Sequence, residues 1–442
     1  MKIKESLQLA IFGFITGLST GFLRSKTLAQ QSNIIPDNTL GGENSRLNSN
    51  VEINGINADR IDGGARRNSN LFHSFQEFNI NNNQAVYFAN PDGIENILTR
   101  VTGGNQSNIF GTLGVDGAAN LFLINPNGIV FGESASLDLQ GSFLGTTASG
   151  LRFGEQGSFN ATNPEIPGSL TVNPSALFFN QVEASGGIIN KSQAPAGINP
   201  NGGETTGLRV ADGKSLLLVG GDINLDGGRL RAYEGNIDLA SVASLGNIGL
   251  DISVNTFSLD IHTNVERGDI SLANESYISV FGAGAGNLIV NARNLEISNS
   301  IIYAGIGENS DNPDAQAGNV NLNITESISL KNDAGINNSV YSKGNAGEIH
   351  INTDSLSLTE GSEINAQTLG QGNAGNITVN ARQSISLDGS GDTILSDGSS
   401  GTIFTRIINS VNPCAVCNAG VIQFNTRYLS ATTGSFISSY TI

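Results

Sequence analysis

The chain has 442 residues and a formal net charge of −17, yet only 14% of its residues are charged and 38% are hydrophobic. This balance excludes a disordered acidic tail, and the acidic charge argues against a nucleic-acid partner, which needs clustered Lys and Arg. Glycine occupies 56 positions without a three-residue period, which excludes collagen, and coiled-coil heptads are missing too. Abundant glycine and asparagine beside Ile, Val and Leu are typical of an all-β chain with many turns.

The N-terminus has the layout of a secretory signal. Two lysines precede an apolar run from Leu7 to Leu23, and small residues follow up to Ala29. This order predicts a signal peptide over residues 1–29. An uncleaved membrane anchor is the alternative, although glycine, serine and threonine in the run weaken a spanning helix. No later segment predicts a membrane helix, so we expect the mature chain to leave the cytoplasm without one.

Residues 34–265 show strand patterns that are short and irregular. Apolar and polar residues alternate at 137–139, 223–225 and 237–239, and aromatic residues cluster between Phe72 and Phe88. Such alternation turns one side of a strand inward and the other toward water. We interpret this half as a β-coil that carries an N-terminal cap and additional strands outside the coil.

Residues 266–442 contain a repeat. Glycines that each begin an alternating strand recur 32, 29, 28 and 45 residues apart, at Gly286, Gly318, Gly347, Gly375 and Gly420. Each copy predicts a glycine turn, an alternating strand, a short polar break and a second alternating strand. A unit of this size cannot bury its apolar side alone, whereas stacked units share one core. The repeat therefore favours a parallel β-solenoid over an antiparallel meander.

The many asparagines agree with such stacking. In stacked coils the same turn position recurs in every coil, and asparagine tolerates left-handed backbone there. Its side-chain amide can also bond to the coil above. We therefore expect single asparagines to combine both properties.

The densest motif is Asn125-Pro126-Asn127-Gly128-Ile129, which apolar strand segments flank on both sides. Proline presets φ for the first turn position, and asparagine or glycine accepts positive φ at the next ones. On spacing alone, the motif predicts a tight corner and nothing more. Similar turns at 90–93 and 199–202 support that interpretation.

Together with residues 109–113 and 141–148, this motif resembles the filamentous haemagglutinin N-terminal domain, the two-partner secretion domain of large exported adhesins. The family carries an Asn-Pro-Asn-Gly-Ile element, which is intact here, and a later Asn-Pro-Asn-Leu element. The later element is present only approximately, as Asn173-Pro174-Ser175-Ala176-Leu177. The resemblance covers residues 34–265, and the repeats of 266–442 are similar to the family's solenoid stalk.

The resemblance implies a fold, a partner and a location. The fold is a single-stranded, right-handed parallel β-helix of the pectin-lyase-like kind. The partner is an outer-membrane β-barrel transporter whose periplasmic repeats bind the domain, after which the chain is secreted or displayed on the cell surface. An extended chain can add a strand to the transporter's sheet with little demand on sequence. Adhesion to glycans or proteins of a host or neighbouring cell would follow.

Cys414 and Cys417 lie in the insertion that widens the last repeat. A redox Cys-x-x-Cys motif would need a βαβ context, which is missing. A zinc site would need two more ligands, and His350, the nearest histidine, is more than 60 residues away. We therefore expect a local disulfide between the two cysteines and no metal site.

Parallel β-helices include polysaccharide lyases and hydrolases, so a secreted polysaccharide-degrading enzyme is the rival function. No Gly-His-Gly element surrounds His73, His262 or His350, and we expect the last two to be exposed strand residues. The sequence therefore predicts neither catalytic residues nor a cofactor. A cleft of paired acids on one face would favour the enzyme, whereas an asparagine-lined face would favour the adhesin.

The delivery end of a contact-dependent toxin is a third possibility, and it would require a large C-terminal effector. The chain instead stops at Ile442 within strand-like sequence, with no pattern that predicts a terminal cap. We expect an open strand edge at that end, which either a truncated stalk or a covering partner would explain.

Overall fold

In the computed structural model, the described residues from Ser32 onward form 39 β-strands and two short 3-10 helices, η1 (Gly41–Glu43) and η2 (Gly154–Gln156). Within the described part of the chain, no helix has the length and apolar character needed to cross a bilayer. The residues described are 32–180, 186–253, 256–261, 265–284, 286–394, 400–411 and 417–441. The expected signal segment, His262 and Cys414 lie outside them.

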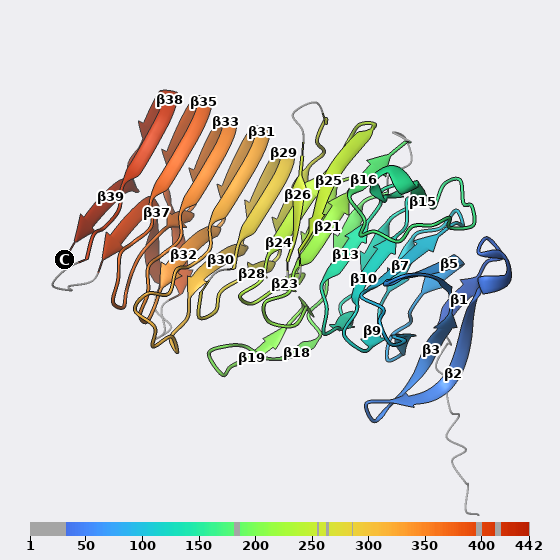
Figure 1. Ribbon diagram of the computed structural model, residues 1–442. Coiled ribbons are helices and arrows are strands. Elements are labelled where there is room, and N and C mark those ends of the chain that lie inside the picture. Colours follow the sequence, from blue (N-terminus) through green and yellow to red (C-terminus); the bar gives the residue numbers. More distant parts are fainter. Residues whose placement is uncertain are drawn as a thin grey trace, which may run out of the picture. The chain divides into compact units, whose positions relative to one another are not determined.

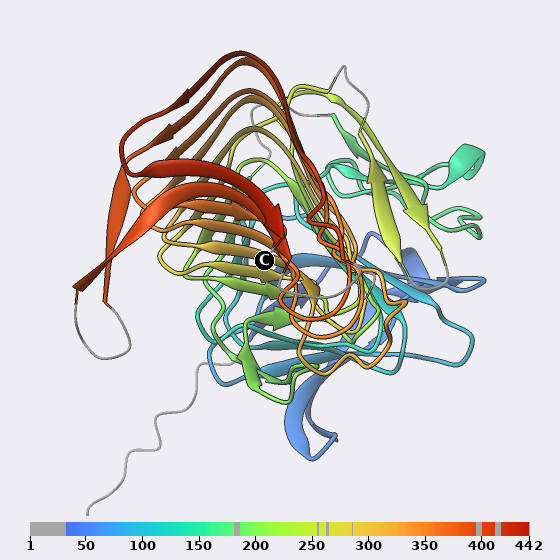
Figure 2. The same ribbon diagram turned by 90° about the vertical axis from the view of Figure 1, so that its left-hand side faces the viewer.

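The chain winds into stacked coils with three faces, and each face is built from parallel strands of successive coils (Figures 1 and 2). The first face consists of β5 (Asn70–Asn79), β7 (Asn96–Val101), β10 (Asn120–Ile124), β13 (Phe143–Thr146), β21 (Leu216–Gly220) and β24 (Ile237–Ser241). The second consists of β8 (Ser107–Ile109), β11 (Ile129–Phe131), β17 (Ile188–Asn190), β22 (Ile223–Asp226) and β27 (Ile270–Ala273). The predicted parallel β-helix is confirmed.

The third face is formed by two sheets in succession. Its strands are β3 (Ile56–Gly63), β6 (Ala85–Ala89), β9 (Thr112–Asp116) and β12 (Ser136–Asp138), then β20 (Leu208–Arg209), β23 (Arg229–Arg231), β28 (Tyr277–Ser279), β30 (Ile301–Ile306), β32 (Gly335–Val340), β34 (Glu363–Asn365), β37 (Ser400–Val411) and β39 (Ser435–Thr441). β36 (Ser390–Ile394) pairs with β37 in the antiparallel sense.

In the stalk, the first and second faces are joined in single long strands. These are β29 (Leu288–Ser298), β31 (Val320–Lys331), β33 (Ile349–Thr359), β35 (Ile377–Asp388) and β38 (Ile422–Ala431). The register between neighbours shifts midway, for example between Ala292 and Asn294, where the strand bends around the coil. The predicted polar break between two strands is therefore a bulge within one strand. The third-face strands β30, β32 and β34 were not predicted, because each buries few apolar residues.

The repeated glycines are required by close contact between coils. A Cβ atom at Gly347 would lie 1.9 Å from the carbonyl oxygen of Gly318, and one at Gly375 would lie 1.9 Å from that of Gly347. Gly318 meets Gly286 in the same way, at 2.3 Å. Any side chain here would push successive coils apart, which explains why glycine marks the start of each repeat.

Strands outside the coil decorate its N-terminal half, as predicted. The cap contains β1 (Asn33–Pro36), β2 (Ser45–Ile53) and β4 (Ala65–Arg67), and a small hairpin joins β18 (Pro195–Ile198) to β19 (Glu204–Thr206). An extra-helical antiparallel sheet covers the first face with β14 (Gly150–Arg152), β15 (Ser158–Asn160), β16 (Ala176–Phe179), β25 (Gly246–Ile252) and β26 (Phe257–Asp260).

The extra-helical sheet gives the protein a second apolar core beside that of the coil. One fills the inside of the coil along its length. The other lies between the first face and the extra-helical sheet, where the rings of Phe122 and Phe257 are 5.4 Å apart. Strands buried on both sides need continuous apolar sequence, and residues 121–124 and 216–219 have it. These two continuous apolar runs are therefore the sequence signal for a sheet that covers the first face.

Asparagines stack in ladders, but the ladder residues are not the ones with left-handed backbone. Asn323 donates to Asn291, and Asn352 donates in turn to Asn323, at 3.3 and 3.1 Å. Positive φ occurs at other asparagines, such as Asn274 and Asn332. These two residues also bond to the preceding coil, since Asn274 donates to Asp226 Oδ1 at 2.7 Å and Asn332 donates to Ser298 Oγ at 2.9 Å. The expectation that one asparagine combines left-handed backbone with a bond to a neighbouring coil is confirmed at these positions.

Candidate functional site

The Asn-Pro-Asn-Gly-Ile motif forms the corner between β10 on the first face and β11 on the second. The Gly128 N–H donates to the Asn125 carbonyl oxygen at 3.1 Å, which closes a four-residue turn. Gly128 has φ of +118°, so glycine is favoured there on conformational grounds. Ile129 begins β11 and is fully buried in the coil. The predicted tight corner is present.

The Asn125 side chain is completely buried and ties neighbouring coils together. Its amide nitrogen donates to the Asn105 carbonyl oxygen at 3.0 Å and to Ser107 Oγ at 2.9 Å. Its Oδ1 accepts the Asn127 N–H at 3.0 Å. In the next coil, the Gly186 N–H donates to the Pro126 carbonyl oxygen at 2.8 Å. Four of the five motif residues are buried, so the motif serves mainly to hold three coils in register.

The turn of residues 199–202 has the same four residue types and the same internal geometry. The Asn199 Oδ1 accepts the Asn201 N–H at 2.9 Å, and the Gly202 N–H donates to the Asn199 carbonyl oxygen. This turn connects β18 to β19 and is half-exposed. The segment after β30 touches it at the surface, where the Glu308 N–H donates to Asn201 Oδ1 at 3.0 Å and the Asn309 side chain donates to the Pro200 carbonyl oxygen at 3.3 Å. Asn125, in contrast, is completely buried between coils. Local turn chemistry is therefore identical at the two sites, and only the surroundings differ.

The second, approximate motif of residues 173–177 leads into the extra-helical sheet. The Ser175 N–H donates to the Arg152 carbonyl oxygen at 2.8 Å, and Ala176 begins β16. Leu177 is fully buried in the outer core and Pro174 is also buried. The exposed Asn173 accepts a 3.0 Å hydrogen bond from Asn96 on β7. Among the described residues, no hydrogen bond joins the two motifs, which lie at opposite ends of the first-face strands.

A second asparagine ladder receives this segment. Asn120 donates to Asn96, and Asn96 donates to Asn70, both at 3.0 Å. Asn70 in turn donates to the carbonyl oxygens of Leu170 and Val172, at 2.9 and 2.7 Å. Both Asn70 and Asn96 are buried. The ladder therefore docks the segment before β16 onto the coil, a role that the sequence analysis did not foresee.

Arg100 is the largest fully buried side chain of the domain and joins the cap, the coil and the extra-helical sheet. Its guanidinium donates to Ser74 Oγ, Thr39 Oγ1 and the carbonyl oxygens of Asn160 and Glu165, at 2.8 to 3.0 Å. It also lies 4.4 Å from the Phe159 ring centre. Burial lowers the pKa of Arg100 to about 10. Four polar partners and an aromatic face compensate for the removal of this charge from water.

Three other titratable groups surround these elements. Burial alone would raise the pKa of Asp37, but hydrogen bonds from Thr102, Thr39 and Ser74 outweigh it and hold the pKa below its usual value. Burial lowers the pKa of His73 to about 3 and raises the pKa of Asp238 to about 7. None of these groups was singled out from the sequence, because their shifts arise from burial by distant segments.

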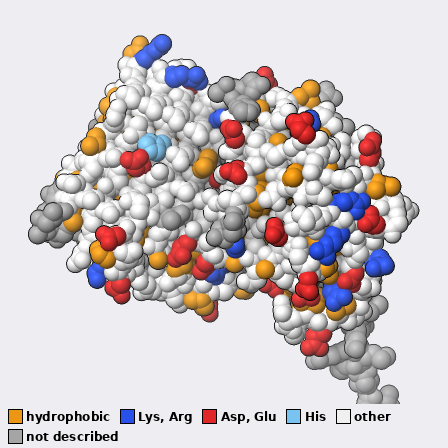
Figure 3. All heavy atoms as spheres, viewed as in Figure 1, with side chains coloured by type: hydrophobic (Ala, Val, Ile, Leu, Met, Phe, Trp, Pro, Cys, Tyr) orange, Lys and Arg blue, Asp and Glu red, His pale blue; other side chains and the backbone are white. Residues whose placement is uncertain are grey.

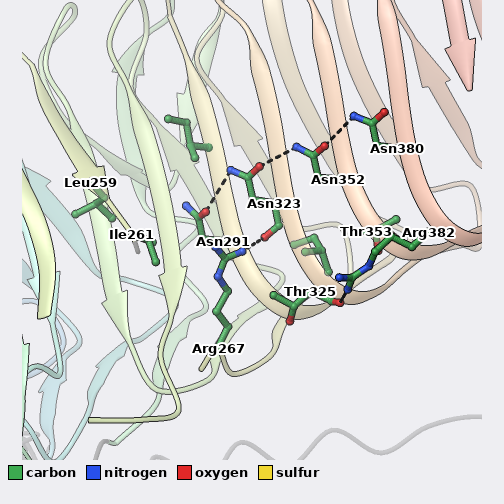
Figure 4. Close-up of a pocket in the computed structure, with 12 residues that line it drawn as sticks. Leu259, Ile261, Arg267, Asn291, Asn323, Thr325, Asn352, Thr353, Asn380 and Arg382 are labelled. Atoms are coloured by element: carbon green, nitrogen blue, oxygen red, sulfur yellow. Dashed lines mark hydrogen bonds between the residues drawn. The ribbon is translucent and has the colours of Figure 1, made fainter. Parts of the chain in front are cut away.

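Two hollows on the outer surface bear on the enzyme alternative. One, of about 600 Å³, lies beside β26 and is lined by asparagines and two arginines, with no carboxylate among its described lining residues (Figure 4). The other, of about 480 Å³, lies on the third face and includes Glu204, Glu275 and Asp333. Burial raises the pKa of Asp333. No cluster of metal-ligating side chains occurs among the described residues.

The charged side chains are scattered over the surface. On the face seen in Figure 3, the stalk shows mostly backbone and uncharged side chains, whereas acidic and basic side chains are more frequent over the N-terminal half. His350 is half-exposed on β33 and contacts Glu348 at 2.7 Å. The disulfide between Cys414 and Cys417 stays a prediction, since Cys414 lies outside the described residues.

Coil, cap and extra-helical sheet together define a parallel β-helix protein with a specialised N-terminal domain. The family model described as the TPS secretion domain matches residues 32–290, which is more than half of the chain. The chain therefore belongs to the TPS secretion domain family, whose members are cargo that an outer-membrane transporter recognises for export. It is a transport-recognition family and not a family of enzymes.

The individual proteins to which the chain is similar match it over a small part of its length or with low sequence identity. A heme/hemopexin-binding protein of Haemophilus influenzae is 37% identical over 86 residues, which are 20% of this chain and 9% of that protein. The chain thus spans less than a tenth of this relative. The HMW1 secretion domain from Haemophilus influenzae is 17% identical, with a TM-score of 0.46 over 91% of this chain and 100% of that structure. The filamentous hemagglutinin secretion domain is 16% identical, with a TM-score of 0.35 over 76% and 94%.

Proposed function

We propose that this chain is an exported adhesin whose domain of residues 34–265 is bound by the periplasmic repeats of an outer-membrane β-barrel transporter. The family match over residues 32–290 is the observation that carries this proposal. The signal segment of residues 1–29 would bring the chain to the periplasm, and residues 266–442 would form the stalk. The mature protein would then be secreted or remain on the cell surface.

The cap offers a strand edge for the transporter. β2 is the last strand of its sheet and pairs with β3 alone. The two strands are joined by Asn54 and Gly55, both with positive φ, which is the geometry of a two-residue hairpin turn. In such a hairpin the residue pairs alternate, so the Glu52 N–H points away from β3. An open edge of this kind can accept a strand from another sheet.

Glu52→Pro tests this edge, because proline removes the outward N–H while leaving the pairing with β3 intact. We expect export through the cognate transporter to fall severalfold, measured as the ratio of surface to periplasmic protein. Glu52→Ala is the matched control, since it keeps the N–H, and should be exported normally. Equal export of the Glu52→Pro and Glu52→Ala variants would show that the transporter does not dock on the edge of β2.

The buried corner at residues 125–129 would act after recognition. Export delivers the chain progressively, and each coil that folds outside must stack on the one before it. Since Asn125 bonds to the preceding coil and Pro126 to the following one, the corner holds the first coils in register. We therefore assign this motif a folding role in export, with little direct contact to the transporter.

An export assay distinguishes this role from a generic turn. Replacing residues 125–129 with alanines should abolish surface display, because the Asn125 side-chain bonds to the preceding coil are lost and a Cβ at Gly128 would be strained at φ of +118°, 3.1 Å from the Gly187 carbonyl oxygen of the following coil. The same replacement at residues 199–202 removes a turn of the same type from a half-exposed hairpin, at the cost of one surface side-chain bond from Glu308, and should reduce display far less. Undiminished export of the first variant would remove the motif's proposed role.

The carboxylates of the third-face hollow allow the enzyme alternative to be tested directly. Its three carboxylates could serve a polysaccharide-degrading reaction if two of them faced a bound sugar. We expect no release of reducing ends from plant or bacterial polysaccharides. If reducing ends are released, and if the Asp333→Asn substitution abolishes that release, the result would instead support the enzyme alternative. The toxin alternative has no specific observation in its favour.

A further inference from the structure

A groove on the outside of the stalk lies where the extra-helical sheet ends. Leu259 and Ile261 form its apolar wall, and the opposite wall is an asparagine ladder (Figure 4). The ladder continues from Asn323 through Asn352 to Asn380, with hydrogen bonds of 3.1 and 2.9 Å. The groove has a volume of about 600 Å³.

Each ladder amide retains bonding capacity toward the groove. An asparagine side chain offers two donors and two acceptor sites, and the ladder uses one of each. The free N–H and carbonyl positions therefore recur once per coil, about 4.8 Å apart. Asn291 is buried beside β26, whereas Asn352 and Asn380 are exposed. The polar wall is thus open to solvent along most of its length.

Two guanidinium groups converge on the floor of the groove. Arg267 donates to the Asn323 carbonyl oxygen at 2.5 Å, and Arg382 donates to the Thr325 carbonyl oxygen at 2.9 Å. These carbonyls are two residues apart on β31, so they lie about 6–7 Å from each other. The arginines come from different elements, the segment after β26 and the strand β35, and flank the same stretch of β31.

Charge compensation in the groove is incomplete. Arg382 pairs with Asp354. Arg267 is half-buried, and no ion pair to a carboxylate is found for it in the described part of the chain. Burial lowers its pKa, with no opposing acidic neighbour. A partly desolvated cation without a carboxylate favours an anionic ligand.

Strand addition does not suit this groove, although β26 is the last strand of its sheet. The Leu259 N–H donates to Asp238 at 3.2 Å, and the Phe257 N–H donates to Ser215 Oγ at 2.9 Å. These bonds occupy main-chain donors that an incoming strand would need. Recognition must therefore use side chains, which suits a ligand rich in hydroxyl groups.

We propose that this groove binds an acidic polysaccharide. A sugar carboxylate or sulfate would pair with Arg267 and Arg382, and the hydroxyl groups would bond to the amides of Asn352 and Asn380. The apolar sides of the sugar rings would lie against Leu259 and Ile261. The inference deepens the adhesive role proposed above by naming a ligand class and a site for it.

Isothermal titration calorimetry on the full chain tests the site with three probes of equal length: an oligouronate, a sulfated glucan and a neutral glucan. At least one acidic probe should bind, more weakly as salt is raised, and the neutral one should bind at least about tenfold less tightly. Preference for carboxylate or sulfate would identify the anion. Arg267→Gln should reduce acidic-glycan affinity about tenfold or more.

Arg293→Gln is the matched control. Arg293 lies on β29, in the same sheet as the ladder strands, and its exposed side chain is paired with Asp269 at 2.7 Å. It should bind within about twofold of the unaltered chain. Melting curves of both variants verify folding. Absence of binding, equal binding of the neutral probe, or equal losses in both variants would overturn the proposal. The titration needs no transporter, and both variants should be exported normally, so failure here is separate from failure of the secretion proposal.

Discussion

The N-terminal half and the stalk build the same coil with different means of stabilisation. In the N-terminal half, single polar groups such as Arg100, Asn125 and Asn70 are buried and each bonds to several distant segments. In the stalk, the same small contact recurs in each coil, as in the ladder of Asn323 and Asn352. One region therefore concentrates its stability in a few residues, and the other distributes it. Substitutions should distinguish the two regimes sharply.

The largest effect is expected at Arg100. Replacing it with methionine keeps much of its bulk but leaves two partly buried carbonyls and two hydroxyls without their partner. We expect the free energy of unfolding in urea to fall by about 3–5 kcal/mol. Arg293→Met in the stalk removes an exposed ion pair and should cost less than about 1 kcal/mol. Similar losses at both sites would contradict the contrast between the regions.

Asp238 should show a pH dependence of the opposite sign to ordinary surface acids. Burial raises its pKa to about 7, and its Oδ1 has no hydrogen-bond partner. The folded state therefore keeps a proton that the unfolded state releases near pH 4, so stability falls as pH rises from about 4 to above 7. Asp238→Asn should gain on the order of 2 kcal/mol at pH 8 and almost nothing at pH 4. Melting temperatures across that range measure it, and a variant less stable at pH 8 would show that the carboxylate is favourable.

His73 should act in the opposite direction in the same half. Its neutral ring is buried near Ser45, and burial lowers its pKa to about 3. The unfolded state takes up a proton below about pH 6.5 while the folded state does not, so stability is lost as pH falls from 6.5 toward 3. At pH 5 this loss is about 1–2 kcal/mol. His73→Gln should remove that part of the acid sensitivity in urea unfolding curves; unchanged sensitivity would assign it to other groups.

Asn352, in the exposed ladder of the stalk, should show the smallest effect, in contrast to Asn70 in the buried ladder. Asn70→Ala removes a fully buried amide and leaves the carbonyls of Leu170 and Val172 without their donor, and it should cost about 2 kcal/mol. Asn352→Ala removes one exposed ladder amide and should cost at most about 0.5 kcal/mol. Chemical denaturation of the two variants measures the difference, and equal costs would mean that burial does not decide a ladder's contribution.

The sequence revealed the stalk far better than the N-terminal half. Alternation at Val320–Leu322 and Ile349–Ile351, together with the spacing of Gly318 and Gly347, was enough to predict stacked parallel coils. Because the same alternation and glycine spacing recur in every copy, each copy supports the prediction made from the others. The bulge within each long strand was taken for a break, because a polar residue at a bend and one at a strand end have the same local pattern.

The N-terminal half offered fewer repeated signals. The runs of residues 121–124 and 216–219 are apolar throughout because the extra-helical sheet covers their outer side. Recognising that requires knowing which segment lies on top of them. The outer groove was equally hidden, because Arg267 and Arg382 are 115 positions apart in the printed sequence and meet only on the carbonyls of β31.

The all-β class, the period of the stalk and the tight turn at each Asn-Pro-Asn-Gly can be predicted from the sequence alone, because they depend on side-chain alternation and local backbone preference. That the turn at Asn125 is buried between coils while the turn at Asn199 is half-exposed depends on the tertiary fold. The Asn125 amide bonds to residues 18 and 20 positions away, so its burial depends on how the coils stack. Local chemistry is the same at both turns, and the neighbouring coils make the difference.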